Sequence, residues 1–129
     1  MYIEIMYSYE RTVEKNAETI FGELHKALKE KDWLILSYVD VKEIFKKMNK
    51  ELEPYYILDV CYPKAAIELI TADPDIGAFI PCKLVLMENG NKTRILMPKP
   101  SVQAKDYLNL NGEIVRKYED ALIGIINEL

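Results

Sequence analysis

The stretch from Tyr55 to Met87 constrains the fold of this chain more than any other segment. Its pattern predicts a strand that closes at Cys61, a short helix, an acidic loop and a second strand that opens at Cys82. Pro63 cannot donate a hydrogen bond to a sheet, but it suits the first turn of a helix. We therefore expect a strand-helix-loop-strand unit that carries both cysteines at strand ends.

Segments with strand periodicity and segments with helix periodicity alternate along the rest of the chain. The expected strands cover residues 3–9, 33–39, 55–61, 82–88 and 92–97, and the expected helices begin near residues 17, 41, 63 and 111. The second strand is apolar on both faces, so we expect it to be central in the sheet. We expect residues 98–108 to form a loop.

Local signals mark several element boundaries. Asn16 and Asp40 each precede a helical pattern and are expected to cap it, and Asn89-Gly90 is a strong hairpin signal. Spacing alone assigns inward positions on the two short helices. The expected inward residues are Ile44, Phe45, Met48, Ala66, Ile67 and Ile70.

The element order β-α-β-α-β-α-β-β-α predicts the fold class. It favours an α+β fold with a single five-stranded sheet, largely antiparallel or mixed, packed with helices. At 129 residues the chain is expected to form one domain over residues 1–129.

Charge and hydropathy exclude some classes of partner. The net charge is −4 and no basic cluster stands out, so we expect no nucleic-acid binding. No apolar run approaches the ~20 residues that a membrane span needs, so we expect no membrane association. Residues 1–10 lack the charged start and apolar run of a signal peptide, and we expect a cytoplasmic protein.

The composition resembles that of hyperthermophile proteins, with abundant Ile, Lys, Glu and Tyr and a single glutamine. This matters for the two cysteines, because intracellular proteins of hyperthermophiles are an exception to the rule against disulfides inside cells.

The cysteines are the residues with the most usable chemistry. Cys61 stands before a helix N-terminus and near Lys64, a setting that can lower the pKa of a thiol, although a small buried apolar residue is the more common role. Parallel strands would hold Cys61 far from Cys82, whereas a loop that returned alongside would make them neighbours. We expect neighbouring, reduced thiols, with Cys61 the more reactive.

No metal site or catalytic set can be assembled from the sequence, and no cofactor is expected. The cysteines are 21 residues apart, which matches neither a CxxC motif nor a four-cysteine zinc site, and His25 is the single histidine. The prolines, the helix start and the acidic loop instead predict a ligand pocket. Its candidate residues are Cys61, Pro63, Lys64, Asp73, Pro81 and Cys82.

The sequence resembles the domain of unknown function 302 family. The resemblance rests on Val60–Ala66, Asp73-Pro74, Ile76-Gly77 and Ile80–Leu86, and it covers the chain from about Asn16 to the end. It implies a compact α+β fold with an antiparallel-rich sheet, single domains and homodimers, and it implies no activity.

Together these observations favour a non-enzymatic cytoplasmic module. We expect a homodimer, because a small monomer cannot easily bury all the aromatic side chains of the expected strands. These include Tyr2, Tyr7, Tyr9 and Tyr38. The module would bind a small ligand or a partner protein near the Cys61–Pro63 and Pro81–Cys82 turns. The alternative is a thiol-redox or metal-handling protein that uses the two cysteines.

Overall fold

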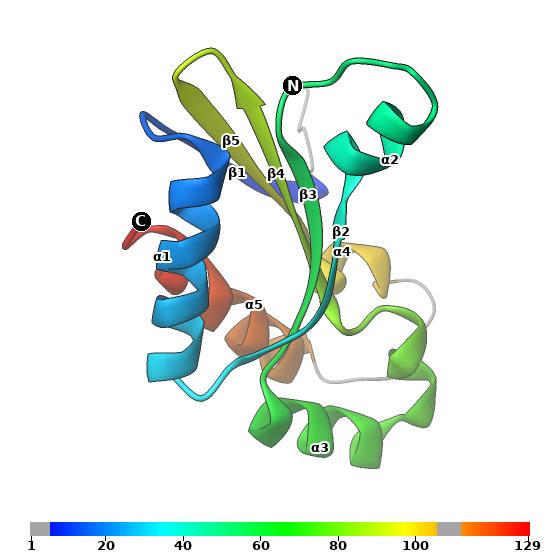
Figure 1. Ribbon diagram of the computed structural model, residues 1–129. Helices are drawn as coiled ribbons and strands as arrows, with labels where there is room; N and C mark the ends of the chain where they lie inside the picture. The colour runs from blue at the N-terminus through cyan, green and yellow to red at the C-terminus, as the bar shows by residue number, and fades with distance from the viewer. Residues whose placement is uncertain (1–5, 106–111) are drawn as a thin grey trace, which may run out of the picture.

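The computed structural model describes residues 6–105 and 112–129 (Figure 1). Its strands are β1 (Ser8–Val13), β2 (Leu34–Asp40), β3 (Tyr55–Cys61), β4 (Cys82–Asn89) and β5 (Lys92–Pro98). Its helices are α1 (Ala17–Glu30), α2 (Val41–Lys47), α3 (Pro63–Ala72), the 3-10 helix η1 (Pro74–Ala78), α4 (Pro100–Gln103) and α5 (Gly112–Ile126).

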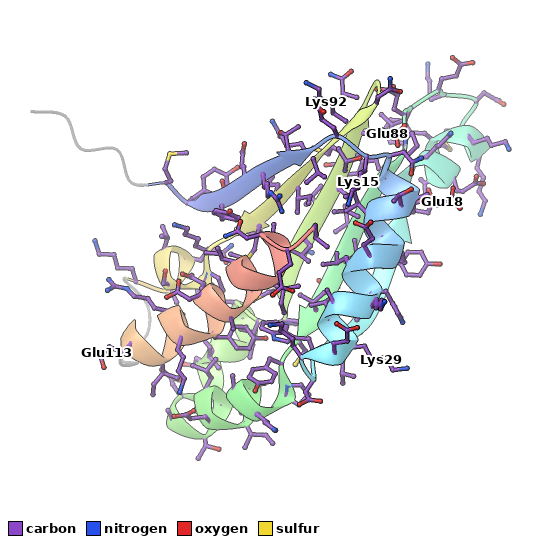
Figure 2. The ribbon with its side chains drawn as sticks, turned by 90° about the vertical axis from the view of Figure 1, so that its left-hand side faces the viewer. Lys15, Glu18, Lys29, Glu88, Lys92 and Glu113 are labelled. Atoms are coloured by element: carbon purple, nitrogen blue, oxygen red, sulfur yellow. The ribbon has the colours of Figure 1, made fainter. Side chains whose placement is uncertain are left out.

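The five strands form one sheet in the order β1-β5-β4-β3-β2, and every neighbouring pair is antiparallel. This confirms the expected fold class. Helices α1 and α5 lie beside each other on one face of the sheet (Figure 2). The central strand β4 is thus covered by helices on one face and connects the two halves of the sheet.

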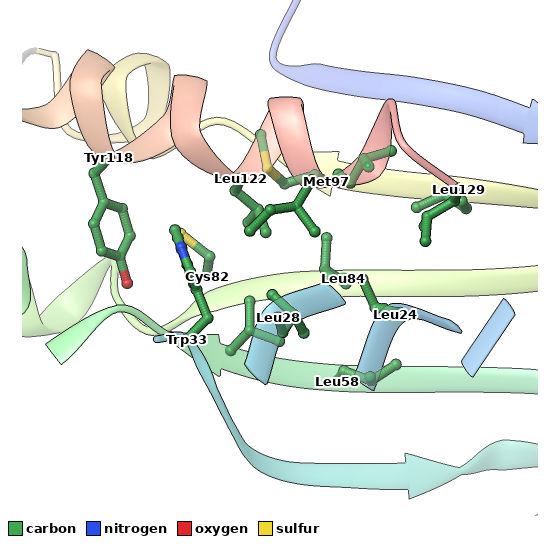
Figure 3. Packing of buried hydrophobic residues seen from close by; sticks show 14 of the residues in the cluster. Leu24, Leu28, Trp33, Leu58, Cys82, Leu84, Met97, Tyr118, Leu122 and Leu129 are labelled. Carbon is green, nitrogen blue, oxygen red and sulfur yellow. The ribbon is translucent and has the colours of Figure 1, made fainter. Parts of the chain in front are cut away.

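The core lies between that face of the sheet and the two long helices (Figure 3). Each strand turns alternate side chains to this face, and each helix contributes a stripe at helical spacing. Fully buried members include Leu58, Leu84, Leu86, Ile20, Leu24, Leu28, Tyr118 and Leu122. Burial of these side chains is the main stabilising contribution to the fold.

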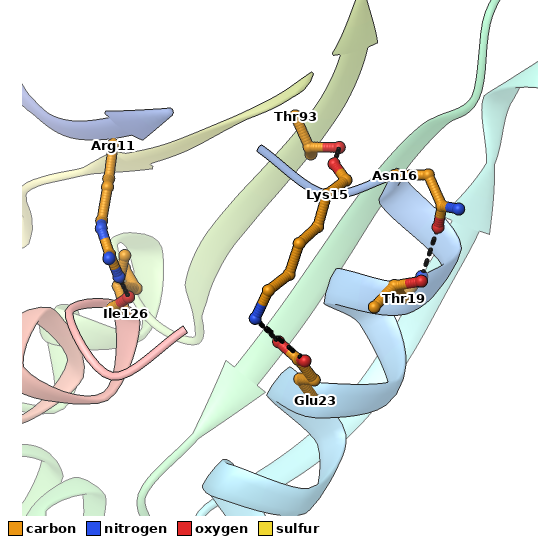
Figure 4. Close-up of polar contacts among 7 residues, drawn as sticks. All are labelled: Arg11, Lys15, Asn16, Thr19, Glu23, Thr93 and Ile126. Atoms are coloured by element: carbon orange, nitrogen blue, oxygen red, sulfur yellow. Dashed lines mark hydrogen bonds and ion pairs between the residues drawn. The ribbon is translucent and has the colours of Figure 1, made fainter. Parts of the chain in front are cut away.

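Short-range hydrogen bonds fix the start of α1 (Figure 4). The Asn16 side chain accepts from the backbone N–H of Thr19 at 2.8 Å, as expected for a capping residue. A tertiary contact supports the same helix end, because the Glu88 carboxylate on β4 accepts from the N–H of Ala17 at 2.7 Å. Helix α1 is therefore tied to the sheet at its first turn.

The expectation that the second strand is central was wrong, because β2 is an edge strand and, among the described residues, pairs only with β3. Its apolar side chains suggested burial on both faces, but Leu34 and Leu36 are 52% and 55% exposed. The chain returns from β3 to β4 on the other side of β3, so within residues 6–105 and 112–129 one edge of β2 stays unpaired.

Several side chains expected to point inward are exposed. These are Ile44 and Phe45 on α2, Met48 directly after it, and Ile67 and Ile70 on α3. Helical spacing alone cannot tell which face of a short apolar helix meets the core. In α3 the buried residues are Ala66 and Leu69.

Two further boundaries differ from the sequence-based expectation. Strand β1 begins at Ser8 and continues to Val13, whereas residues 3–5 of the expected first strand lie outside the described residues. The expected loop after β5 contains the short helix α4, and residues 106–111 also lie outside the description. Across 6–105 and 112–129, no helix is long and apolar enough to cross a membrane.

Candidate ligand-binding site

The two cysteines lie at the same end of neighbouring antiparallel strands. Cys82 opposes Val60 in the β3–β4 register, so Cys61 is one residue beyond that pair. Both are free thiols, and their charged forms would interact. Because the loop returns antiparallel rather than crossing over, the two cysteines are neighbours, and no disulfide joins them.

Tyr118 on α5 connects the thiols to the start of α3. Its hydroxyl oxygen accepts from the backbone N–H of Tyr62 at 3.3 Å, and its side chain hydrogen-bonds with both Cys61 and Cys82. In the sequence, Tyr118 stands out only as one of the apolar residues at helical spacing in the last helical segment. A tyrosine within such a stripe is the signal that could have revealed a buried polar partner.

Aromatic rings form the floor of this region. The rings of Trp33 and Tyr62 are stacked, with centroids 5.3 Å apart and an angle of 14° between the ring planes. This separation is typical of aromatic pairs. Trp33 also packs against Tyr118 at 5.0 Å and 40°. This cluster joins the end of β3 to α5.

The surroundings of the thiols favour their neutral forms. Burial raises the pKa of Cys82 to about 12, which outweighs the lowering effect of the hydrogen bond with Tyr118. Burial also raises the pKa of Cys61, again against a smaller lowering by Tyr118. The pKa of Tyr118 itself is raised, chiefly by burial. The expected activation of Cys61 by the α3 N-terminus is thus opposed by desolvation.

The predicted site residues are not gathered around a single cavity. Pro63 begins α3, and Lys64 is exposed, 4.0 Å from Asp32 across a weak surface pair. The carboxylate of Asp73 accepts from the N–H of Asp75 at 3.0 Å and caps η1. Pro81 follows a cis peptide bond at the start of β4.

Hollows adjoin both of the turns that carry these residues. One, the Pro81 cavity, measures about 250 Å³ and lies at the start of β4. Its lining includes Phe79, Ile80, Pro81, Cys82, Pro98 and Gln103. The other, the Tyr62 groove, consists of two adjoining hollows of about 340 and 350 Å³ that share Tyr62 and Ala121.

A more spacious hollow lies elsewhere among the described residues and offers little for binding. It measures about 830 Å³ and lies between α2 and the loop that precedes β3. Its lining is mostly exposed charged side chains, such as Lys46, Lys50 and Glu51. Ligand sites usually need a larger share of buried apolar lining.

No metal centre is found in the described part of the chain. Within it, no group of three His, Cys, Asp or Glu side chains is placed to hold an ion. His25 is exposed on α1.

The geometry defines a small α+β domain with an antiparallel sheet, helices on one face and hollows beside its cysteine-bearing strand ends. Residues 9–129 match the family described as Domain of unknown function DUF302, and the chain belongs to this family. The resemblance noted in the sequence is thereby confirmed.

A solved structure shares this fold over nearly its whole length. It is the crystal structure of an uncharacterized conserved protein DUF302 from Bacillus stearothermophilus, with a TM-score of 0.87 and 26% sequence identity. The match covers 95% of this chain and 98% of that chain. No curated protein matches the chain.

We expect both thiols to react slowly with iodoacetamide in the folded protein, and Cys61 to react before Cys82. Only the thiolate reacts, so a pKa of about 12 makes Cys82 on the order of a thousandfold slower at pH 8 than a free cysteine. Labelling should accelerate about tenfold per pH unit from pH 7 to pH 9. Mass spectrometry of the wild type, Cys61→Ser and Cys82→Ser would measure each rate.

The urea-unfolded protein serves as the control, since both cysteines should then label at similar rates. Fast labelling of Cys82 in the folded state, or a Cys61 rate already constant near pH 7, would contradict this prediction.

Proposed function

We propose that the chain is a non-enzymatic module that assembles as a homodimer and binds a small ligand or a partner protein near the Cys61–Pro63 and Pro81–Cys82 turns. The observation that carries ligand binding is that a hollow lies beside each turn. The Pro81 cavity combines apolar walls with the polar side chains of Asp59, Lys83 and Gln103, a composition typical of small-molecule sites. The two free thiols suit the reducing cytoplasm, where we place the protein.

A separate observation supports the homodimer. Exposed apolar side chains gather on β2 and α2, and we call this region the β2–α2 surface. It consists of Leu34, Leu36, Tyr38, Val39, Ile44, Phe45 and Met48. Apolar patches of this kind usually mark interfaces.

The backbone of β2 strengthens this argument. As an edge strand it has one side that no other described strand pairs with, and its residues from Leu34 to Val39 include no charge and no proline. Edge strands normally carry charged residues or prolines, which prevent pairing with another chain. Tyr38 also belongs to an aromatic cluster with Phe21 and Tyr56, which holds this part of the surface in place. A second copy of the chain would cover both the apolar side chains and the strand edge.

The other aromatic residues named for the dimer differ in their surroundings. Tyr7 is exposed, and the hydroxyl of Tyr9 hydrogen-bonds with the Asn127 side chain. Tyr2 lies outside the described residues. The dimer proposal therefore depends on Tyr38 and its neighbours on the β2–α2 surface.

Light scattering after size-exclusion chromatography tests the dimer. The wild type should show twice the 15.0 kDa chain mass at micromolar concentration. The double variant Leu36→Lys, Met48→Glu should return to the monomer mass with an unchanged circular dichroism spectrum, because it places charges on the apolar surface. Ile67→Lys, at an exposed apolar position on α3, is the matched control and should stay dimeric. A monomeric wild type would refute the homodimer.

The alternative of thiol redox or metal handling has weaker support. The raised pKa values of Cys61 and Cys82 oppose thiolate chemistry, and a metal ion would also require deprotonated thiols.

A further inference from the structure

We propose that the Tyr62 groove binds a flat aromatic carboxylate, with its ring system against the aromatic floor and its carboxylate between Lys64 and Lys117. This inference rests on the proposed ligand-binding function and adds the place and the chemical class of the ligand. The proposed ligand site is the Tyr62 groove beside the Cys61–Pro63 turn. The Pro81 cavity, beside the Pro81–Cys82 turn, is not part of this inference.

The shape of the groove suits a flat apolar body. Tyr62 lines both of its hollows and stacks on Trp33, so the floor is aromatic and held in place from below. The walls carry small residues, with Ala65 on α3 and Ala121 on α5. Gly124 extends this opening, since a Cβ atom there would meet nothing within 4 Å. Each hollow has a volume within the range of about 300–1,000 Å³ that small-molecule sites show.

The charged side chains that line the groove favour a negatively charged ligand. Lys64 and Lys117 line the hollow between α3 and α5, opposed there by the single carboxylate of Glu68. Lys117 has no ion-pair partner among residues 6–105 and 112–129. Lys64 has only the weak exposed contact with Asp32. This hollow therefore carries a net positive charge, although the whole chain carries −4.

The second hollow of the groove, near Gly124, has a net negative charge. This difference in charge between the two hollows sets the orientation of the ligand. Lys31 pairs with Glu128 at 3.2 Å, which leaves Asp120 as the unbalanced charge of its lining. A carboxylate is thus favoured at the α3 end and disfavoured toward Gly124. The apolar body would extend over Tyr62 toward Ala121.

Isothermal titration calorimetry with naphthalene-2-carboxylate, and with the neutral naphthalene-2-carboxamide, tests this inference. The wild type should bind the carboxylate more tightly than the amide. Ala121→Phe should weaken binding of both by at least about tenfold, because the new ring fills the groove. Ala121 is exposed, so the variant should keep its fold, as circular dichroism would verify.

Matched variants separate place from charge. Lys117→Gln should weaken carboxylate binding about two- to fivefold and leave the amide unchanged, whereas Lys46→Gln in the α2 hollow should change neither. Ala78→Phe, which fills the Pro81 cavity, should also leave binding unchanged.

The outcomes also distinguish this inference from the proposed function. Loss of binding in Ala78→Phe but not in Ala121→Phe would overturn the inference and preserve a ligand site near the Pro81–Cys82 turn. Absence of binding by the wild type, or equal binding of carboxylate and amide, would overturn the inference that the groove binds an aromatic carboxylate. Neither result would bear on the homodimer, which light scattering tests separately. Binding that no variant alters would overturn the inference and the proposed site together.

Discussion

Replacing Leu84 by alanine is expected to lower the free energy of unfolding by about 2–5 kcal/mol. Leu84 is completely buried at the middle of the central strand β4, where α1 and α5 both reach the sheet. The substitution removes apolar surface from the core and leaves a cavity that a close-packed interior fills only in part. Urea denaturation followed by circular dichroism would measure the loss.

Ile67→Ala is the matched control for this prediction. Ile67 is 69% exposed on α3 and alanine is a good helix former, so the free energy of unfolding should change by no more than about 0.5 kcal/mol. Similar losses for the two variants would show that Leu84 does not lie in the stabilising core.

Replacing Glu119 by methionine is expected to cost about 1–3 kcal/mol of the free energy of unfolding. Glu119 on α5 is 3% exposed, and its carboxylate accepts from the backbone N–H of Ser101 at 2.6 Å and from the Ser101 hydroxyl at 2.9 Å. Methionine keeps much of the volume but leaves the part-buried N–H of Ser101 without its acceptor. Because Ser101 lies in α4, amide hydrogen exchange should also accelerate in that helix.

Glu119→Gln separates the hydrogen bonds from the charge. Its amide oxygen can accept from the Ser101 N–H while its amide nitrogen donates to the hydroxyl oxygen, so most of the stability should be retained. If the glutamine variant were as unstable as the methionine variant, the negative charge itself, rather than hydrogen-bond satisfaction, would hold α4 against α5.

The short-range features of the fold could be predicted from the sequence, because each depends on neighbouring residues. Asp40 accepts from the N–H of Glu43 at 3.1 Å at the start of α2, as its capping motif indicated. Gly90 has a φ of 66° in the β4–β5 turn, a conformation that the Asn-Gly signal specifies. Pro63 begins α3 because its fixed φ suits a first helical turn.

Part of the candidate site was also predictable. Both cysteine-bearing turns were located from strand ends, prolines and the helix start, and hollows adjoin both of them. The proximity of the thiols was left between two geometries, since strand direction depends on how the loop returns. Tyr118 could not be placed between them, because it is more than 35 residues farther along the chain and only the packing of α5 brings it there.

The sequence alone determined the type and order of the five strands and of helices α1, α2, α3 and α5, because hydrophobic period and capping are local properties. The tertiary structure decided which strand is an edge and which helix face is buried. The sequence of an apolar strand such as Leu34–Asp40 does not show whether one neighbouring strand or two will pair with it. In the same way, the spacing of α3 is compatible with an inward side chain at Ile67 as well as at Leu69, but only Leu69 is buried. Strand order and the buried face of each helix depend on how the helices pack together on one face of the sheet, and this packing involves residues from the whole chain.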